Sequence, residues 1–258
     1  MPFKQYIRKC DKKGEYWGGQ SFEEHLSLCE LQLTTDLLLE NLPEDGLVLE
    51  AGCGLARWVV YLRRKGFKTF GLDVSHETLQ EARRHARDVP LIAGDVLLMP
   101  FKDAEFAAVL SFGVVEHLEG MLPAAFEEMR RVLKKDGILF LAVPCLNTLR
   151  RIIVHPYIIV RNLVRRMRGV ELVFDEYRYS RNEVRKLLVQ NGFEPLRTVP
   201  DDLELPYAMG LCRDFRDRFG NAEKFELNRF GLFMERILRK LSPWISCGGV
   251  FCVAKRET

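Results

Sequence analysis

Residues 48–58 read VLEAGCGLARW, and this stretch decides the fold that the sequence predicts. A short apolar run at 47–49 stops at Glu50, and the turn Gly52-Cys53-Gly54 leads into a helical pattern over about 57–65. Glycines at a strand-to-helix turn let the backbone adopt unusual dihedral angles and approach a ligand closely. A lone Gly-x-Gly is equally compatible with a plain tight turn, so the neighbouring elements must decide between the two.

The same alternation of strand and helix continues along the chain. Further apolar runs predict strands at 68–72, 91–93, 106–111 and 138–143, and helical patterns lie between them, one with Ser75 as its N-cap. Strands that alternate with helices at this spacing predict a parallel sheet covered on both faces. Residues 21–41 carry leucines at helical spacing and predict one more helix, ended by Pro43 and Gly46.

Four polar residues each follow a different apolar strand of this pattern: Glu50, Asp73, Asp95 and Ser111. The carboxyl ends of parallel strands share one edge of a sheet, and ligands bind beyond that edge. We therefore expect these four side chains to line one ligand site.

The residues by themselves leave two classes of cofactor open. Asp73 ends the strand after the glycine turn, about 20 residues on, where an acidic side chain accepts hydrogen bonds from both hydroxyls of a ribose. A dinucleotide site requires Gly-x-Gly-x-x-Gly, but the sixth position here is Arg57, which would crowd the pyrophosphate. Asp95 is placed to bond an exocyclic amino group such as that of adenine. These features favour an adenosyl cofactor over a nicotinamide dinucleotide.

At this point the sequence resembles the class I S-adenosylmethionine-dependent methyltransferases, in the branch often called methyltransferase type 11. The resemblance rests on five motifs in family order: VLEAGCGLARW (48–58), GLDVS (71–75), AGDVLLMPF (93–101), FAAVLSFGVVEHL (106–118) and VLKKDGILFLAVP (132–144). It covers residues 30–145, and more weakly 178–199 and 249–256, where GFEPLRTV and GGVFCVAKR look like a closing antiparallel hairpin.

The resemblance implies an α/β, Rossmann-like fold: a seven-stranded, mostly parallel sheet with helices on both faces and a C-terminal antiparallel hairpin. It implies S-adenosylmethionine as cofactor and S-adenosylhomocysteine as product. The cofactor-binding residues that it implies are Glu50, Ala51, Gly52, Cys53 and Gly54 at the methionine part, Asp73 and Val74 at the ribose and adenine, Asp95 and Val96 at the adenine amino group, and Ser111 and Phe112 near the sulfonium. Ala56 departs from the family, which often has a third glycine there, and this leaves the shape of the loop open.

The resemblance also implies a single domain over 1–258, with a core at 30–145, 178–199 and 249–256. Insertions at 146–178 and 200–247 would form a lid and the pocket for a small-molecule or lipid-like methyl acceptor. We expect no metal and identify no catalytic residue, because proximity and alignment can supply most of the acceleration of methyl transfer from a sulfonium. The alternative is a protein that binds this cofactor without transferring its methyl group, as a sensor or partner subunit.

Composition limits the remaining classes. With 47% hydrophobic and 29% charged residues, the 258-residue chain is typical of a globular protein. The net charge of +3 is too small to indicate a nucleic-acid binder. The seven cysteines form no Cys-x-x-Cys pair, which predicts reduced thiols and a cytoplasmic location. The first 14 residues lack the apolar core of a signal peptide, and no stretch reaches the roughly 18 apolar residues of a membrane span.

Several side chains outside the motifs are further candidates. We expect His117 to pack at the start of a helix and Glu116 to orient nearby backbone. Tyr16 and Trp17 precede the first predicted helix and could close over the methionine part of the cofactor. Five residues of the insertions could contact the acceptor or take its proton: His155, Tyr157, Tyr177, Tyr179 and Tyr207.

Residues 146–170 contain six arginines and no acidic residue. Three interpretations stay open for the stretch from Arg150 to Arg168. It could be a solvated helix face, a basic amphipathic surface that contacts anionic lipid or a lipid-like acceptor, or a nucleic-acid contact, against which the absence of a recognition module argues. Pro156 predicts that no single helix runs through this stretch.

Overall fold

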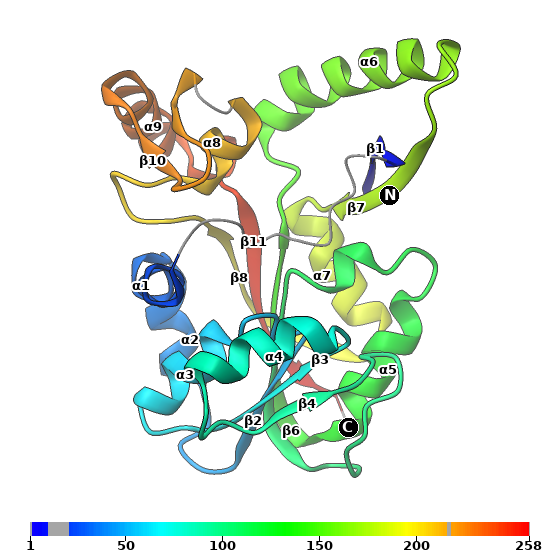
Figure 1. Cartoon of the computed structure of the whole chain (residues 1–258), viewed down its shortest axis with the longest axis vertical. Helices are drawn as coiled ribbons and strands as arrows, with labels where there is room; N and C mark the ends of the chain where they lie inside the picture. The colour runs from blue at the N-terminus through cyan, green and yellow to red at the C-terminus, as the bar shows by residue number, and fades with distance from the viewer. Residues whose placement is uncertain (1, 10–20, 216–217, 258) are drawn as a thin grey trace.

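The central sheet has seven strands in the order β4-β3-β2-β5-β6-β11-β8 (Figure 1). The computed structural model describes residues 2–9, 21–215 and 218–257. The strands of the sheet are β2 (Leu47–Ala51), β3 (Lys68–Asp73), β4 (Leu91–Ala93), β5 (Phe106–Phe112), β6 (Leu133–Pro144), β8 (Phe193–Asp201) and β11 (Gly249–Arg256). Neighbouring strands from β4 to β6 are parallel, and β11 is antiparallel to both β6 and β8. The predicted fold class is confirmed, and residues 202–248 separate the two closing antiparallel strands.

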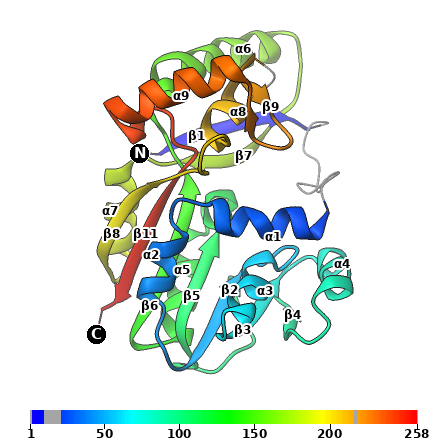
Figure 2. The ribbon, with the colours of Figure 1, turned by 90° about the vertical axis from the view of Figure 1, so that its left-hand side faces the viewer.

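Helices cover both faces of this sheet (Figure 2). One face packs against α1 (Phe22–Leu31), α2 (Thr35–Asn41), α3 (Arg57–Arg64) and α4 (His76–His85), and the other against α5 (Leu122–Val132) and α7 (Arg181–Gln190). Along β5, Val109 belongs to one core cluster while Ala108 and Leu110 belong to the other. Because both faces of the strand are buried, its sequence is a continuous apolar run.

The prediction of one helix over 21–41 is wrong, because the chain leaves the helical conformation between α1 and α2. Gln32 has an extended backbone. Its side-chain amide and the hydroxyl of Thr34 both donate to the carboxylate of Asp201, at 2.7 and 2.8 Å. The N–H of Leu33 donates to the carbonyl oxygen of Asp202 at 2.9 Å. The interruption therefore satisfies buried acceptors at the end of β8, which a continuous helix could not reach.

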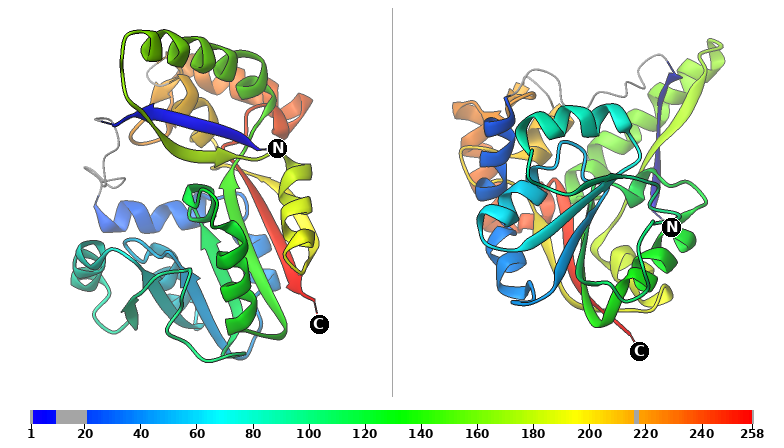
Figure 3. Two further views of the ribbon diagram at one scale, coloured as in Figure 1. Left: turned by 90° about the vertical axis from the view of Figure 1, so that its right-hand side faces the viewer. Right: turned by 60° about the horizontal axis from the view of Figure 1, so that its bottom comes forward.

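The first insertion forms a helix and a strand that stand beyond the sheet. Residues 150–154 (η3) are π-helical, α6 (His155–Met167) follows, and β7 (Leu172–Arg178) pairs antiparallel with the N-terminal strand β1 (Phe3–Arg8) (Figure 3). Pro156 marks the start of the α-helix, as the prediction that no single helix runs through this stretch implies, although the chain stays helical from η3 into α6. Proline lies in the first turn of α6, and the wider π-helical turn before it accommodates the ring and the missing N–H.

The second insertion comprises α8 (Met209–Phe215), β9 (Gly220–Asn221), β10 (Glu226–Leu227), α9 (Arg229–Leu241) and η5 (Pro243–Ile245). Its elements enclose a small apolar cluster around Leu211 and Leu227, against which Leu149 of the first insertion also packs. The two insertions therefore share one core.

A buried ion pair joins the two insertions to each other and to the sheet. The guanidinium of Arg150 is 1% exposed and its Nε lies 2.7 Å from Asp214 in α8. Its Nη1 donates to the carbonyl oxygens of Cys145, at 2.6 Å, and Gly248, at 2.9 Å, which lie at the ends of β6 and β11. Arg150 is therefore no part of an exposed basic surface, contrary to the expectation that the surface stretch begins there.

This ion pair makes a testable contribution to stability. Arg150→Met keeps the length of the side chain but leaves Asp214 buried without its main partner. Because breaking a buried ion pair costs about 3–5 kcal/mol, we expect urea denaturation to show a loss of that size in the free energy of unfolding. Arg84→Met removes an exposed ion pair with Glu81 and should cost less than about 1 kcal/mol. Equal losses for both variants would contradict the role given to Arg150.

Candidate cofactor site

The glycine turn after β2 is held against the end of β3. The N–H groups of Gly52 and Cys53 both donate to the carbonyl oxygen of Leu72, at 2.7 and 2.8 Å. Gly52 has φ +86°, and a Cβ atom there would lie 2.2 Å from Cγ2 of Val114. Gly54 has φ +52° and Ala56 has φ +63°. Ala56 thus adopts the left-handed conformation that a glycine takes most readily, and the chain keeps the turn despite the alanine.

Asp73 connects this turn to the next helix. One carboxylate oxygen accepts the N–H of Gly54 at 2.8 Å, and the other accepts the N–H of Ser75 at 2.9 Å. Ser75 in turn caps α4 by accepting the N–H of Thr78, as the sequence predicted. A carboxylate oxygen has about two lone-pair sites, so each oxygen of Asp73 can accept one further hydrogen bond.

A small cavity of about 40 Å³ opens beside the turn. It is lined by His25, Glu50, Gly52, Cys53, Leu55, Arg57, Trp58 and Phe112. Glu50 is buried and accepts the N–H of Val59 at 3.2 Å. Burial raises the pKa of Glu50 to about 8, although the positive charge of Arg57 acts in the opposite direction. Burial, and then the charge of Arg57, lowers the pKa of His25. The cavity therefore combines one acidic side chain, Glu50, with two basic ones, Arg57 and His25.

Asp95 and Val74 lie at the ends of the next two strands. The exposed carboxylate of Asp95 accepts the N–H of Leu97 at 2.9 Å. Val74 is 75% exposed, and Leu98, which sequence reasoning did not single out, is 79% exposed. Val96 is buried and belongs to the core. Two apolar side chains thus lie open to solvent at the rim that carries the carboxylates of Asp73 and Asp95.

Ser111 and Phe112 are neighbours in the chain, but only Phe112 lines the cavity. Phe112 lines the cavity and meets the Trp58 ring edge to face, with 5.6 Å between ring centres. Ser111 lies within β5, is fully buried and does not line the cavity. Its position one residue before the end of the strand explains this, because successive residues of a strand face opposite sides.

Three cavity residues were missed by sequence reasoning: His25, Leu55 and Trp58. Leu55 and Trp58 belong to the quoted motif, so their neighbourhood in the chain was a usable signal. His25 comes from α1 and is 25 residues before Glu50, and nothing in its local pattern distinguishes it from a core histidine. Arg57, which had served to exclude a dinucleotide, also lines the cavity.

The other candidate side chains lie elsewhere. Glu116, in the short helix η2 (Val115–His117), is buried, and burial raises its pKa to about 8. His117 is exposed rather than packed, and its Nδ1 lies 2.7 Å from the carbonyl oxygen of Asp175 in β7. Tyr16 and Trp17 lie outside the described residues.

The five candidates of the insertions do not form one cluster. Tyr157 is 64% exposed on α6, and Tyr207 belongs to the second insertion. Tyr177 and Tyr179 contact each other in and beside β7, with ring centres 6.0 Å apart. The ring of His155 stacks on Phe3 at 3.6 Å, and burial lowers its pKa to about 4.

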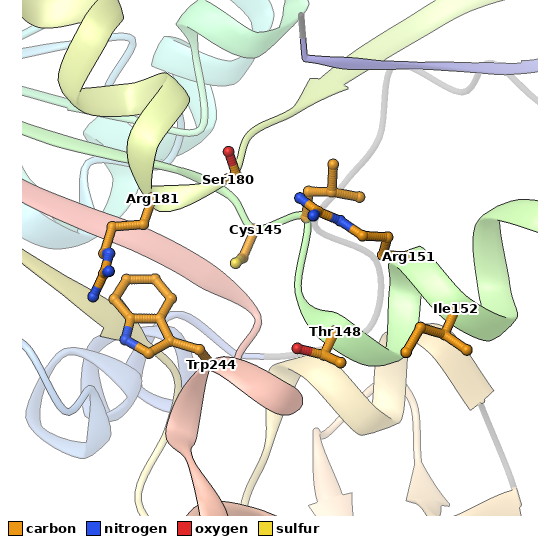
Figure 4. A pocket seen from close by; sticks show the side chains of 8 residues that line it. Cys145, Thr148, Arg151, Ile152, Ser180, Arg181 and Trp244 are labelled. Atoms are coloured by element: carbon orange, nitrogen blue, oxygen red, sulfur yellow. The ribbon is translucent and has the colours of Figure 1, made fainter.

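A second cavity, of about 370 Å³, lies where the insertions meet the sheet (Figure 4). Its lining residues are Cys145, Leu146, Thr148, Arg151, Ile152, Ser180, Arg181 and Trp244. The guanidinium of Arg181 lies 5.5 Å from the centre of the Trp244 ring. This cavity shares no lining residue with the cavity at Glu50.

Comparison with known proteins identifies the class. Residues 49–141 match the family model described as a methyltransferase domain. Malonyl-[acyl-carrier protein] O-methyltransferase of Erwinia pyrifoliae is 34% identical over 119 residues, which are 46% of this chain and 45% of that protein. The chain spans about half the length of the curated relatives it matches.

Solved structures share the fold. A S-adenosylmethionine-dependent methyltransferase from Methanosarcina mazei has a TM-score of 0.60 at 17% identity, covering 86% of this chain and 97% of that one. Geranyl diphosphate C-methyltransferase from Streptomyces coelicolor, crystallised with S-adenosyl-L-homocysteine, has a TM-score of 0.56 at 19% identity, covering 86% and 74%. The fold and the matched segment define a methyltransferase domain. Residues 49–141 thus carry a methyltransferase domain, and the whole sheet has the fold of solved S-adenosylmethionine-dependent methyltransferases.

The contact between Gly52 and Val114 can be tested with a matched pair of variants. Gly52→Ala and Gly120→Ala both place a side chain at a positive φ, +86° and +76° respectively. Only Gly52 has no room for a Cβ, since nothing lies within 4 Å of one at Gly120. We expect urea denaturation to show that Gly52→Ala costs about 1–3 kcal/mol more than Gly120→Ala. Equal costs would mean that strain of the backbone, and not the Val114 contact, requires glycine in the turn.

Proposed function

We propose that this protein transfers a methyl group from S-adenosylmethionine, by in-line displacement, to a small-molecule or lipid-like acceptor. The observation that carries the proposal is the arrangement of Glu50, Asp73 and Asp95. They lie at the ends of three neighbouring strands, and Glu50 and Asp73 flank a glycine turn that leaves no space for a side chain at Gly52. S-adenosylmethionine supplies an activated methyl group on a sulfonium, so the chain's own residues need mainly to bind and align the reactants.

The residues of the rim fit the parts of this cofactor. In the proposal, Glu50 holds the ammonium group of the methionine part and Arg57 holds its carboxylate, since the cavity is lined by an acidic side chain and by a guanidinium. The free lone pairs of Asp73 accept the ribose hydroxyls. Val74 covers the adenine, whose amino group donates to Asp95. This arrangement accounts for the exposure of Val74, which would be covered when adenine is bound.

The proposal of a small-molecule or lipid-like methyl acceptor is supported by the names of similar proteins and by the charge of the chain. Two of the similar proteins are named for malonyl-[acyl-carrier protein] and for geranyl diphosphate. The net charge of +3 gives no support to a nucleic-acid acceptor. In this proposal the basic residues between Arg151 and Arg168 contact an anionic membrane surface and bring the protein to a lipid-like acceptor.

Isothermal titration with S-adenosylhomocysteine, with NAD as the control ligand, tests the cofactor. We expect binding of the first and none of the second. Release of S-adenosylhomocysteine from S-adenosylmethionine in the presence of extracted lipids or of acyl-carrier-protein thioesters then tests methyl transfer. Binding without transfer to any acceptor would support a cofactor-binding protein that lacks the activity, and tight binding of NAD would overturn the proposal.

The role of Asp73 predicts a loss of affinity. Asp73→Ala removes the acceptor of the ribose hydroxyls and of the Gly54 N–H. We expect the Kd for S-adenosylhomocysteine to rise at least tenfold in calorimetry, while circular dichroism shows an intact fold. Asp88→Ala, at an exposed loop position, serves as the control and should leave the Kd unchanged. An unchanged Kd for Asp73→Ala would remove the residue from the site.

The raised pKa of Glu50 predicts a pH dependence of binding. With a pKa of about 8 the carboxyl group is protonated at neutral pH, and an ammonium group placed beside it favours the ionised form. Binding should therefore release a proton below pH 8, and the affinity for S-adenosylhomocysteine should rise between pH 6 and 8, by at most tenfold per pH unit. Calorimetry in buffers of different ionisation enthalpy measures this proton release.

Two glutamine variants locate the titrating group. Glu50→Gln should abolish the proton release and flatten the pH profile. Glu116→Gln is the control, because Glu116 is also buried with a pKa of about 8 but does not line the cavity. It should leave the pH profile of binding as it is.

The raised pKa of Glu50 also affects the stability of the unliganded protein. Between pH 4.5 and 8 the carboxyl group is ionised in the unfolded chain but protonated in the folded one, so the free energy of unfolding falls as the pH rises. Glu50→Gln should reduce that loss.

A further inference from the structure

Large apolar side chains are exposed mainly on two helices, one from each insertion. On the segment 150–167, which includes α6, the exposed apolar side chains are Ile152, Ile153, Tyr157, Ile159, Val160, Leu163, Val164 and Met167. On α9 they are Phe230, Phe233, Ile237 and Leu241, at spacings of three, four and four residues. This spacing places the four side chains of α9 on one face of the helix. We call these two sets together the two-helix apolar surface.

Polar and apolar contacts together join these helices to the protein: Ile158 of α6 is buried, and Leu232 and Leu238 of α9 pack on the core around Leu211. From α6, Asn162 donates to the carbonyl oxygen of Tyr6 at 3.2 Å, and the Arg166 guanidinium lies 5.5 Å from the centre of the Tyr6 ring. From α9, the fully buried Glu235 accepts hydrogen bonds from Arg239 at 2.6 Å and Ser246 at 3.0 Å. The exposed apolar side chains are therefore not the ones that anchor the two helices to the protein.

The exposed charged side chains on the two helical segments all carry positive charge. The exposed charged side chains of residues 150–168 and of α9 are Arg151, Arg166, Arg168, Arg229, Arg236 and Lys240. The acidic residue of α9, Glu235, is buried in its hydrogen bonds. A surface with this charge is complementary to an anionic partner, whereas two copies of it would repel each other.

The two helices lie at the same end of the molecule. Figures 1 and 2 show α6 and α9 beyond the carboxyl ends of the parallel strands, the end at which Asp73 and Asp95 lie. The shared core around Leu211 and the ion pair between Arg150 and Asp214 connect the insertions that carry them. Within the described ranges, none of the helices has the length and apolarity needed to cross a bilayer. These properties are those of helices that lie in the plane of a membrane interface.

We infer that the two-helix apolar surface docks this protein on an anionic lipid bilayer, with the side chains of α6 and α9 in the interface and the arginines at the headgroups. This inference rests on the proposed function only for its consequence, that the methyl acceptor is a lipid-like molecule taken from the bilayer. The docking itself requires no methyl transfer. It extends the expectation of basic contact from one arginine-rich segment to two apolar faces, the second of which comes from a different insertion.

Flotation with vesicles tests the docking. The full-length protein is mixed with vesicles of phosphatidylcholine alone or of phosphatidylcholine with 30% phosphatidylglycerol, at about 0.1 and 0.5 M salt, concentrations that bracket strong screening of surface charges. We expect at least tenfold more bound protein on the anionic vesicles at low salt, and a decrease at high salt. Equal binding to both vesicle types, or no binding to either, would overturn the inference.

Variants distinguish the two-helix surface from a general attraction of charge. Leu163→Asp on α6 and Phe233→Asp on α9 each place a carboxylate on the apolar surface, and each should lower the bound fraction about tenfold or more. Val189→Asp is the matched control, because Val189 is an exposed apolar residue, at 55%, on α7. It should bind as the unmodified protein does. If Phe233→Asp also binds unchanged, α9 is not part of the surface and the inference fails.

Two further readouts separate this inference from its alternatives. S-adenosylhomocysteine binding by the same variants should be unchanged, so that a loss of vesicle binding cannot be ascribed to misfolding or to the cofactor site. Sedimentation velocity reports whether a second copy covers the surface. A dimer that Leu163→Asp and Phe233→Asp dissociate, with no vesicle binding, would assign the surface to self-association and refute membrane docking. Failure of the cofactor titration would refute the proposed function but would leave the vesicle result as it stands.

Discussion

The turn at Gly52 is held against β3 by three backbone N–H groups, and the geometry of the candidate site follows from this contact. Two of the groups donate to Leu72 and the third, from Gly54, donates to Asp73. A side chain at Gly52 would collide with Val114, so the contact between turn and strand tolerates no Cβ. Because the turn is fixed in this way, Glu50 is buried beside it while the carboxylate of Asp73 keeps lone pairs for a ligand.

The two insertions are held together by different interactions from those that stabilise the sheet. The sheet is stabilised by apolar residues buried on both faces, whereas the insertions combine a small apolar core with buried polar contacts: Arg150 pairs with Asp214, and Glu235 accepts from Arg239 and Ser246. Buried charges need such partners, because an unpaired one is costly. Since these polar contacts and the small core around Leu211 already anchor the helices, the exposed apolar side chains of α6 and α9 are left for something outside the chain.

Part of the lining of the candidate site could be predicted from local patterns: Glu50, Gly52, Cys53 and Phe112 line the cavity. Glu50, Asp73 and Asp95 follow strands whose apolar runs are visible in the sequence, and the parallel sheet brings the ends of such strands together. The burial of Ser111 could not be predicted in this way, since one residue of register decides whether a side chain at a strand end faces the rim or the core. His25 could not be predicted, because it reaches the cavity only through the packing of α1 on α3.

The sequence by itself determined the alternating strands and helices, the glycine turn and the order of the carboxylates, because each depends on spacing between residues near in the chain. Only the tertiary structure decided which arginine is buried, where the helix over 21–41 is interrupted and which way the apolar faces of α6 and α9 point. Arg150 is 64 residues from Asp214, and Gln32 is 169 residues from Asp201. Helical periodicity shows that a face is apolar, but the contacts on its opposite side determine whether that face is turned inward or outward.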